Sequence, residues 1–324
     1  MKLWFENFPH YWLKQNNFIV DVLHTKTNIE ITSENPDLVV FSDFGDINAL
    51  NKYKCKKCFY TLENIHFVVL NQSNINYFDS KSIIKEDPLL APIKYPFEYY
   101  LKYADFSLLF YETNAKNIEV PVWLALLPVK TKNLKNYYDD RNHYKILTEK
   151  RTAFNKKEYC SFICSNKFVG DDIDYWAENI SPRYKLFDEL NKKQFIHSGG
   201  KYKNNIGRPV KNKCDYLKKF VFNLAFENSY HHYYTSEKLV EPFFSSCIPV
   251  YWGGERCFDF MRKDLVVYAN NKNSDEIHEE MLEIYNDEYK IKYMTTEPVI
   301  DKYPIEYTPK YIAEQILDRT FYTT

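Results

Sequence analysis

The chain has 324 residues, of which 45% are apolar and 18% are aromatic. Its 43 Lys and Arg residues nearly balance 44 Asp and Glu residues, so the formal net charge is −1. This composition excludes a disordered chain and predicts a folded protein with two domains of ordinary size. The charge balance and the lack of a basic run or a ribonucleoprotein aromatic signature argue against a nucleic-acid partner.

Short apolar runs that end in turn residues predict a series of strands. In chain order these runs occupy residues 1–8, 37–45, 56–64, 105–111, 158–166, 194–200, 220–228, 247–254 and 264–270. Amphipathic stretches between or after them predict helices at residues 175–192, 211–220, 236–246, 275–289 and 309–322. Strands that alternate with helices are typical of parallel sheets covered by helices, so the predicted fold class is α/β.

A hydrophilic stretch, "NYYDDRNHYKILTEKRTAFNKKEY", separates the two groups of strands. It is a suitable linker and predicts a first domain over residues 1–150 and a second over 151–306. The last helix, within residues 307–324, is expected to pack back across the domain boundary.

The amino-terminal segment and the cysteines indicate the compartment. "MKLWFENFPHYWLKQ" lacks the features of a signal peptide, and no window holds about 20 consecutive apolar residues. We therefore expect a cytoplasmic protein. The seven cysteines are scattered, and Cys55 and Cys58 form only half of a zinc-ligand pattern, which favours reduced structural thiols and no metal site.

Glycine is scarce, and its placement draws attention to the second domain. Of seven glycines in the chain, two adjacent pairs, Gly199–Gly200 and Gly253–Gly254, directly follow predicted strands. Ligands of open α/β sheets bind beyond the carboxyl ends of strands, where glycine permits close approach of the main chain. The alternative is that each pair only closes a tight turn.

The segment "FENSYHHYYTSEKLVEPFFSSCIPVYWGG", residues 226–254, joins a strand to a helix. Thr235 or Ser236 can cap that helix, which leaves Glu237 and Lys238 in its first turn. The helix dipole disfavours a lysine there by a few tenths of a kcal/mol, whereas a phosphate about 4 Å from the ammonium gains on the order of 4 kcal/mol at an effective dielectric near 20. The pattern therefore favours an anion site, with a solvated Glu–Lys surface pair as the alternative.

This segment resembles the donor-binding signature of the α1,3/4-fucosyltransferase family, F-E-N-S, then Y-x-T-E-K, then I-P-[IV]-Y-W-G. Tyr234 to Lys238 match its centre, with Ser236 where the family usually has Thr. The stretches "EYCSFICSN", "SPRYKLFDELN" and "HSGGKYKNNIG" extend the similarity through the second half. In the first half "NPDLVVFSDFG", "KKCFYTLEN" and "NIEVPVWLAL" are similar to the acceptor domain of bacterial members.

The resemblance implies a GT-B fold, with two Rossmann-like domains facing a central cleft. It places the acceptor in the first domain and GDP-fucose in the second, with no cofactor and no metal required. By similarity, Arg183 and Lys238 hold the pyrophosphate, and Asn228, Tyr234 and Glu237 surround the nucleotide and the fucose. Preorganised cations suit this task because charge accumulates on the departing GDP.

The resemblance also implies a catalytic base in the first domain. Glu63 matches the glutamate of the family's Y-T-G-E-N turn, although Leu62 replaces the glycine. An insertion from residue 65 to residue 103 follows and leaves Glu86, Asp87 and Glu98 as rival bases.

The expected function is inverting transfer of L-fucose from GDP-β-L-fucose to a glycan, giving an α-fucoside at O3 of N-acetylglucosamine. The expected acceptors are N-acetyllactosamine-type glycans, lipopolysaccharide or glycolipid, and peripheral association with the inner face of the membrane stays open. Two alternatives remain: a GT-B enzyme that uses another sugar nucleotide, and an inactive carbohydrate-binding relative. His197 beside the first glycine pair could contact phosphate, whereas a loop role is favoured for His231 and His232.

Overall fold

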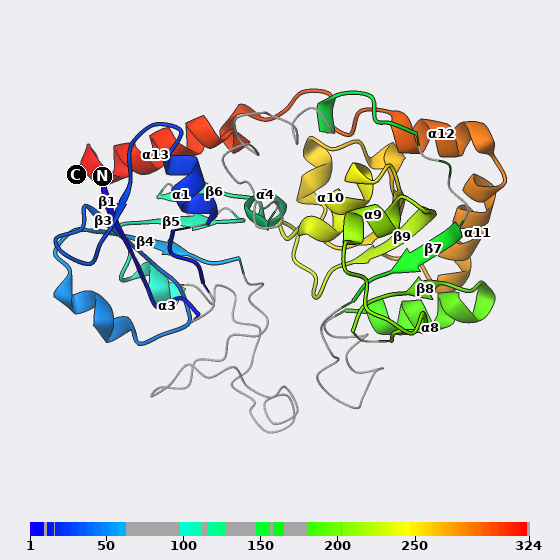
Figure 1. Ribbon diagram of the computed structural model, residues 1–324, viewed down its shortest axis with the longest axis horizontal. Helices are drawn as coiled ribbons and strands as arrows, with labels where there is room; N and C mark the ends of the chain where they lie inside the picture. Colours follow the sequence, from blue (N-terminus) through cyan, green and yellow to red (C-terminus); the bar gives the residue numbers. More distant parts are fainter. Residues whose placement is uncertain are drawn as a thin grey trace, which may run out of the picture. The chain divides into compact units, whose positions relative to one another are not determined.

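The computed structural model divides the chain into two compact units, each with its own sheet (Figure 1). The first unit comprises Met1–Asp140 together with Pro304–Thr324, and the second comprises Arg141–Tyr303. The structure describes residues 1–9, 12–15, 17–62, 98–111, 116–126, 147–153, 155, 158–164, 181–201 and 203–322.

A parallel sheet with the strand order β2-β1-β3-β4-β5-β6 forms the centre of the first unit. Its strands are β1 (Lys2–Glu6), β2 (Glu30–Ile31), β3 (Leu38–Phe41), β4 (Lys56–Tyr60), β5 (Phe106–Leu109) and β6 (Asn117–Glu119). Every residue of β3 and β5 is buried, as expected for parallel strands whose two faces are both covered. Four of these strands confirm the prediction, whereas β2 and β6 are too short to give a periodic pattern.

Helices at both ends of the sequence, together with two short ones between them, belong to the first unit. Within the described residues they are α1 (Phe18–Leu23), α3 (Glu98–Leu101), α4 (Val122–Leu126) and α13 (Pro309–Phe321), with 3₁₀ turns at Ile47–Lys52 and Ile305–Tyr307. Helix α13 packs against α1 and β6, and the hydroxyl of Tyr307 donates a hydrogen bond to Glu119 Oε1 at 2.6 Å. The last segment of the chain therefore completes the first unit (Figure 1).

The second unit contains a parallel sheet with the order β11-β10-β9-β7-β8. Its strands are β7 (Glu158–Phe162), β8 (His197–Ser198), β9 (Phe220–Phe226), β10 (Ile248–Trp252) and β11 (Val267–Tyr268). All seven residues of the central strand β9 are buried. Burial on both faces explains why six of its seven residues are apolar, with Asn223 as the exception, instead of apolar and polar residues alternating. The predicted α/β class with parallel sheets is confirmed.

Five α-helices of the second unit fall within the part of the chain that the structure describes: α8 (Arg183–Lys193), α9 (Lys213–Leu217), α10 (Glu237–Phe244), α11 (Ser274–Tyr285) and α12 (Glu288–Thr296). The prediction of one helix over 275–289 is wrong, because Asp287 starts a new helix. Its side chain accepts hydrogen bonds from the backbone N–H groups of Tyr289 and Lys290. An aspartate at this position caps a helix instead of continuing one.

Candidate functional site at the end of β9

The residue that follows β9 fixes the start of helix α10. The Glu227 side chain is completely buried, and its Oε1 accepts a hydrogen bond from the backbone N–H of Ser236 at 2.7 Å. Oε2 accepts a second bond from the Ser236 hydroxyl at 2.6 Å. Ser236 is the N-cap of α10, and its hydroxyl accepts from the backbone N–H of Lys238. The carboxylate thus ties the first turn of the helix to the end of the sheet.

Lys238 lies at the centre of this junction. Its Nζ is 3.3 Å from Glu227 Oε2, 3.0 Å from Ser236 Oγ and 3.9 Å from Glu237 Oε1. Burial acts against the charged ammonium, but the carboxylates of Glu227 and Glu237 outweigh it and raise the pKa of Lys238. The side chain nevertheless keeps 20% exposure. The result is a charged ammonium, held on one side by carboxylates and open to solvent on another.

Arg183 is the second cation and the first residue of helix α8. It is only 4% exposed, and its Nη1 donates a hydrogen bond to Asn228 Oδ1. Its Nε is buried and has no hydrogen-bond partner within the described ranges. The charge of Arg183 lowers the pKa of Lys238, so the two cations are within electrostatic reach of each other.

Tyr234 lies beside this pair, in the loop before α10. It is buried, and its phenol contributes to the raised pKa of Lys238. The Tyr234 carbonyl accepts a hydrogen bond from the backbone N–H of Gly254 at 3.2 Å. A Cβ on Gly254 would lie only 2.5–2.7 Å from the carbonyl oxygens of His231, His232 and Tyr234. This glycine is therefore required by close packing of the loop on the end of β10.

The structure thus brings together all five residues that the sequence suggests for this site: Arg183, Asn228, Tyr234, Glu237 and Lys238. Sequence reasoning gave Glu227 no role in this set, although its carboxylate binds both Ser236 and Lys238. The available signal was its position directly after a seven-residue strand with six apolar residues, which is where a strand-end side chain turns toward the next helix.

His197 does not join this group through any contact in the described residues. Its Nε2 is 3.2 Å from Glu158 Oε2, and its ring contacts those of Phe195 and Phe220. These contacts assign the imidazole a local role beside the first strand of the second sheet.

The candidate base Glu63 lies outside the described residues, as do Glu86 and Asp87. Glu98 is the first residue of α3, but its side chain is not among those described. At the carboxyl ends of β3 and β4 the structure instead describes Asp43, which is 4% exposed. Burial raises the pKa of Asp43, against hydrogen bonds from its own amide and from Thr61.

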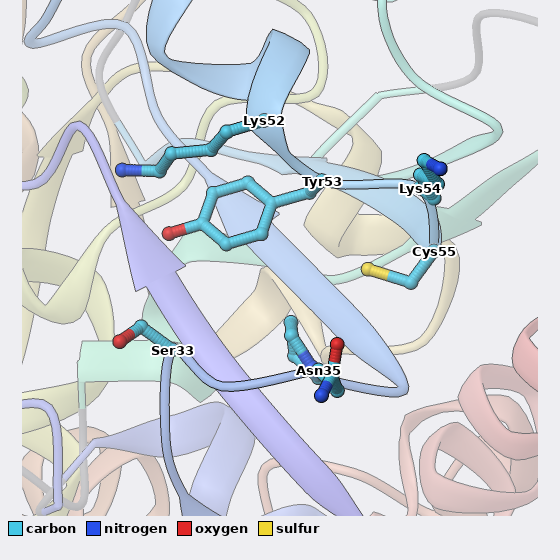
Figure 2. A pocket seen from close by; sticks show the side chains of 7 residues that line it. Ser33, Asn35, Lys52, Tyr53, Lys54 and Cys55 are labelled. Atoms are coloured by element: carbon cyan, nitrogen blue, oxygen red, sulfur yellow. The ribbon is translucent and has the colours of Figure 1, made fainter.

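A cavity of about 620 Å³ in the first unit is not a candidate for this site (Figure 2). Its lining residues are Ser33, Asn35, Pro36, Lys52, Tyr53, Lys54 and Cys55. Most of them precede β3 or β4, so the cavity lies toward the amino ends of the strands, opposite the edge where α/β sheets bind ligands. Lys52 and Tyr53 both bind Glu6 Oε2, at 3.1 and 2.8 Å.

The described ranges contain no group of three or more His, Cys, Asp or Glu side chains arranged to hold a metal ion. All seven cysteines are free thiols. None of the described helices combines the length and the apolar character needed to span a bilayer.

Comparison with known proteins identifies the family. The model of the glycosyltransferase family 10 (fucosyltransferase) C-terminal region matches residues 166–295, and the model of the alpha-(1,3)-fucosyltransferase FucT N-terminal domain matches residues 3–123. Alpha-(1,3)-fucosyltransferase FucT of Helicobacter pylori is 27% identical over 276 residues, which cover 80% of this chain and 50% of the relative. The chain therefore spans about half the length of that protein.

Solved structures give the same result for the fold. A crystal structure of an α1,3-fucosyltransferase matches with a TM-score of 0.66 and 20% identity, over 100% of this chain and 90% of the other. A crystal structure of α1,3-fucosyltransferase with GDP-fucose matches with a TM-score of 0.65 and 19% identity, over 100% and 91%. With two family models matching in order along the sequence, the chain belongs to the family 10 fucosyltransferases and has the GT-B fold.

Proposed function

We propose that the chain is an inverting α1,3-fucosyltransferase that transfers L-fucose from GDP-β-L-fucose to a glycan hydroxyl. The observation that carries the proposal is the pair of cations, buried Arg183 and partly exposed Lys238, held by consecutive residues at the end of β9. Family membership supports the choice of fucose as the sugar.

Each cation suits one part of a diphosphate. The guanidinium of Arg183 has an Nε without a partner in the described structure, and a planar fork of donors matches phosphate oxygens. Lys238 supplies a compact charge in the first turn of α10. The backbone N–H groups at the start of a helix also favour a bound anion. In this proposal the two cations stabilise the negative charge that develops on GDP as the glycosidic bond breaks, and no metal is required.

Three further residues complete the proposed donor site. Tyr234 and Glu237 both act electrostatically on Lys238, so they lie within reach of a nucleotide sugar bound there. We assign Glu237 to the donor hydroxyls because a carboxylate accepts their hydrogens. Asn228 accepts a hydrogen bond from Arg183 Nη1 and would keep the guanidinium in place beside the donor.

On the acceptor side we propose Glu63 as the general base, on the strength of the family resemblance. It would remove the proton from O3 of N-acetylglucosamine while that oxygen attacks the anomeric carbon from the side opposite GDP. The product is an α-fucoside. The proposed acceptors are N-acetyllactosamine-type glycans, free or on lipopolysaccharide or glycolipid, and a lipid-linked acceptor would bring the cytoplasmic enzyme to the inner face of the membrane.

A donor and acceptor screen tests the proposal. The purified protein is incubated with GDP-fucose, GDP-mannose or UDP-sugars and with N-acetyllactosamine, lactose or N-acetylglucosamine, with and without EDTA. Mass spectrometry is expected to detect one deoxyhexose added to the acceptor when GDP-fucose is the donor, and none with the other donors. NMR is expected to locate the added sugar at O3 of N-acetylglucosamine in α linkage. Transfer from another donor, or no binding of GDP, would overturn the proposal.

A further inference from the structure

We infer that Glu227 is a positioning residue that holds the Lys238 ammonium in place for the diphosphate of the donor. This inference rests on the proposed function. It extends the site by one residue that would not contact the nucleotide itself, because its carboxylate is completely buried.

Both carboxylate oxygens of Glu227 have hydrogen-bond partners inside the protein. A buried carboxylate is strongly unfavourable unless hydrogen bonds and a counter-charge compensate for its lost hydration. Here its two oxygens accept from the Ser236 N–H, the Ser236 hydroxyl and the Lys238 ammonium, at 2.7, 2.6 and 3.3 Å. A strand-end glutamate in this environment has a defined task inside the protein and is not merely a surface residue.

These contacts also restrict the position of the Lys238 ammonium. A lysine has a flexible four-carbon stem and three N–H donors. Two of the donors are directed to Glu227 and Ser236. The third has only Glu237 Oε1 near it among the printed contacts, at 3.9 Å, beyond hydrogen-bond distance, and the 20% exposure of the side chain gives a ligand access to it. The ammonium is therefore held in one orientation before a phosphate arrives, which reduces the entropy cost of binding.

The main chain at Glu227 also lies close to the second cation, Arg183. Its carbonyl accepts a hydrogen bond from the Ser181 hydroxyl at 2.9 Å, next to the start of α8, and the following residue, Asn228, binds Arg183. One dipeptide at the end of β9 thus sets the positions of both cations.

Gly253 supplies the space for this arrangement. A Cβ at position 253 would lie 2.6 Å from Glu227 Cγ and 2.4 Å from the Tyr251 hydroxyl. The lack of a side chain at Gly253, directly after β10, therefore leaves room for the Glu227 side chain. Replacement of Gly253 by alanine displaces Glu227 without changing any charge.

The test compares two buried glutamates. Glu227→Gln keeps the shape but removes the charge beside Lys238. Glu241→Gln is the matched control, because Glu241 is also buried, lies on α10 with Lys238 and pairs with a different lysine, Lys213, at 2.7 Å. Calorimetric titration with GDP should give about tenfold weaker affinity or more for Glu227→Gln, the size of one charge-assisted hydrogen bond, and unchanged affinity for Glu241→Gln.

A pH profile separates positioning from simple structural support. Glu227 and Glu237 raise the pKa of Lys238, with Tyr234 acting in the same direction and Arg183 against them. Removing the Glu227 charge lowers the pKa of Lys238, so GDP affinity in Glu227→Gln should decline at a lower alkaline pH than in the original protein. A variant that is only less stable would keep the original profile.

The outcomes are distinct. If the original protein does not bind GDP, the proposed function is wrong. If it binds GDP but Glu227→Gln binds equally well with the same pH profile, only the role of Glu227 is wrong. Should Glu227→Gln not fold, Ser236→Ala decides: weaker GDP binding that Ser236→Thr restores supports the inference, and unchanged binding in Ser236→Ala overturns it.

Discussion

Two consecutive residues at the end of β9 account for most of the electrostatics of the site. Glu227 binds Lys238, and Asn228 binds Arg183. The carboxylate of Glu227 offsets the charge of Lys238, whereas Asn228 gives Arg183 a neutral oxygen acceptor, and the charge of Arg183 still lowers the pKa of Lys238. At the scale of single residues, the site is therefore a network of ionic and neutral hydrogen bonds that an additional anion between the cations would stabilise.

Lys238→Ala tests the phosphate role directly. Loss of a charge-assisted contact should weaken GDP binding by about 1.5–3 kcal/mol, which corresponds to roughly 10- to 100-fold in Kd. The matched control is Lys193→Ala, a lysine of the same unit that pairs with Asp275 at the surface. Calorimetry that gives equal GDP affinity for Lys238→Ala and the original protein would contradict the assignment.

Glu63→Gln tests the base. Transfer should fall by about 10²- to 10⁴-fold while GDP affinity is retained, because a general base acts only on the acceptor hydroxyl. Glu34→Gln, at an exposed position of the first unit, serves as the control. The rates are measured as product formed per minute under saturating GDP-fucose, and undiminished turnover would direct attention to Glu98 or Asp43.

At the scale of elements, helix α1 contains an acidic residue that limits the stability of the first unit. Burial raises the pKa of Asp21 to about 6, and its Oδ2 has no hydrogen-bond partner in the described residues. Because the folded protein binds this proton more tightly than the unfolded chain, the contribution of Asp21 to stability is greatest below about pH 4. It declines as the pH rises toward 6 and stays lower above that value.

Asp21→Asn should therefore stabilise the protein at pH 7 and have little effect at pH 4. After allowance for partial solvent exposure of the carboxyl group, the expected gain in unfolding free energy at pH 7 is about 1 kcal/mol. Denaturant unfolding at both pH values measures it. An equal effect at pH 4 and pH 7 would show that titration of Asp21 is not the cause.

Some of the helices and strands could be predicted from the sequence and others could not. Strand β9 was predictable because six of its seven residues are apolar on both faces of the strand, and the α10 cap because Ser236 precedes an amphipathic run. The break between α11 and α12 was missed because Asp287 looks like one more polar residue on a helical face until its cap is seen. Strand β2 has only two residues, which is too short for any periodicity.

The candidate site was predictable only in part, for a physical reason. Family resemblance indicated Arg183 and Lys238, and the structure brings them together. The role of Glu227 was not predictable, because a strand-end glutamate has the same sequence pattern whether it is solvated or completely buried. Tertiary packing, here of Ser236 and Gly253 around its carboxylate, makes the difference.

At the scale of the whole molecule, the two units should differ in their response to mutations in the last helix. Ile316 of α13 is completely buried in the first unit, and Ile316→Ala should cost about 2–5 kcal/mol there. GDP binding by the second unit should be retained under native conditions. Ile305, 70% exposed in the same segment, provides Ile305→Ala as the control. Thermal unfolding together with GDP titration measures both effects.

The return of α13 to the first unit has a consequence for the order of events on the ribosome. Residues 141–303 emerge as one uninterrupted stretch and can adopt their structure as soon as they leave the exit tunnel. The unit that begins at Met1 must wait, with its α1 face uncovered, until Pro309–Phe321 has been translated. The half that appears first during synthesis is thus the half that matures last.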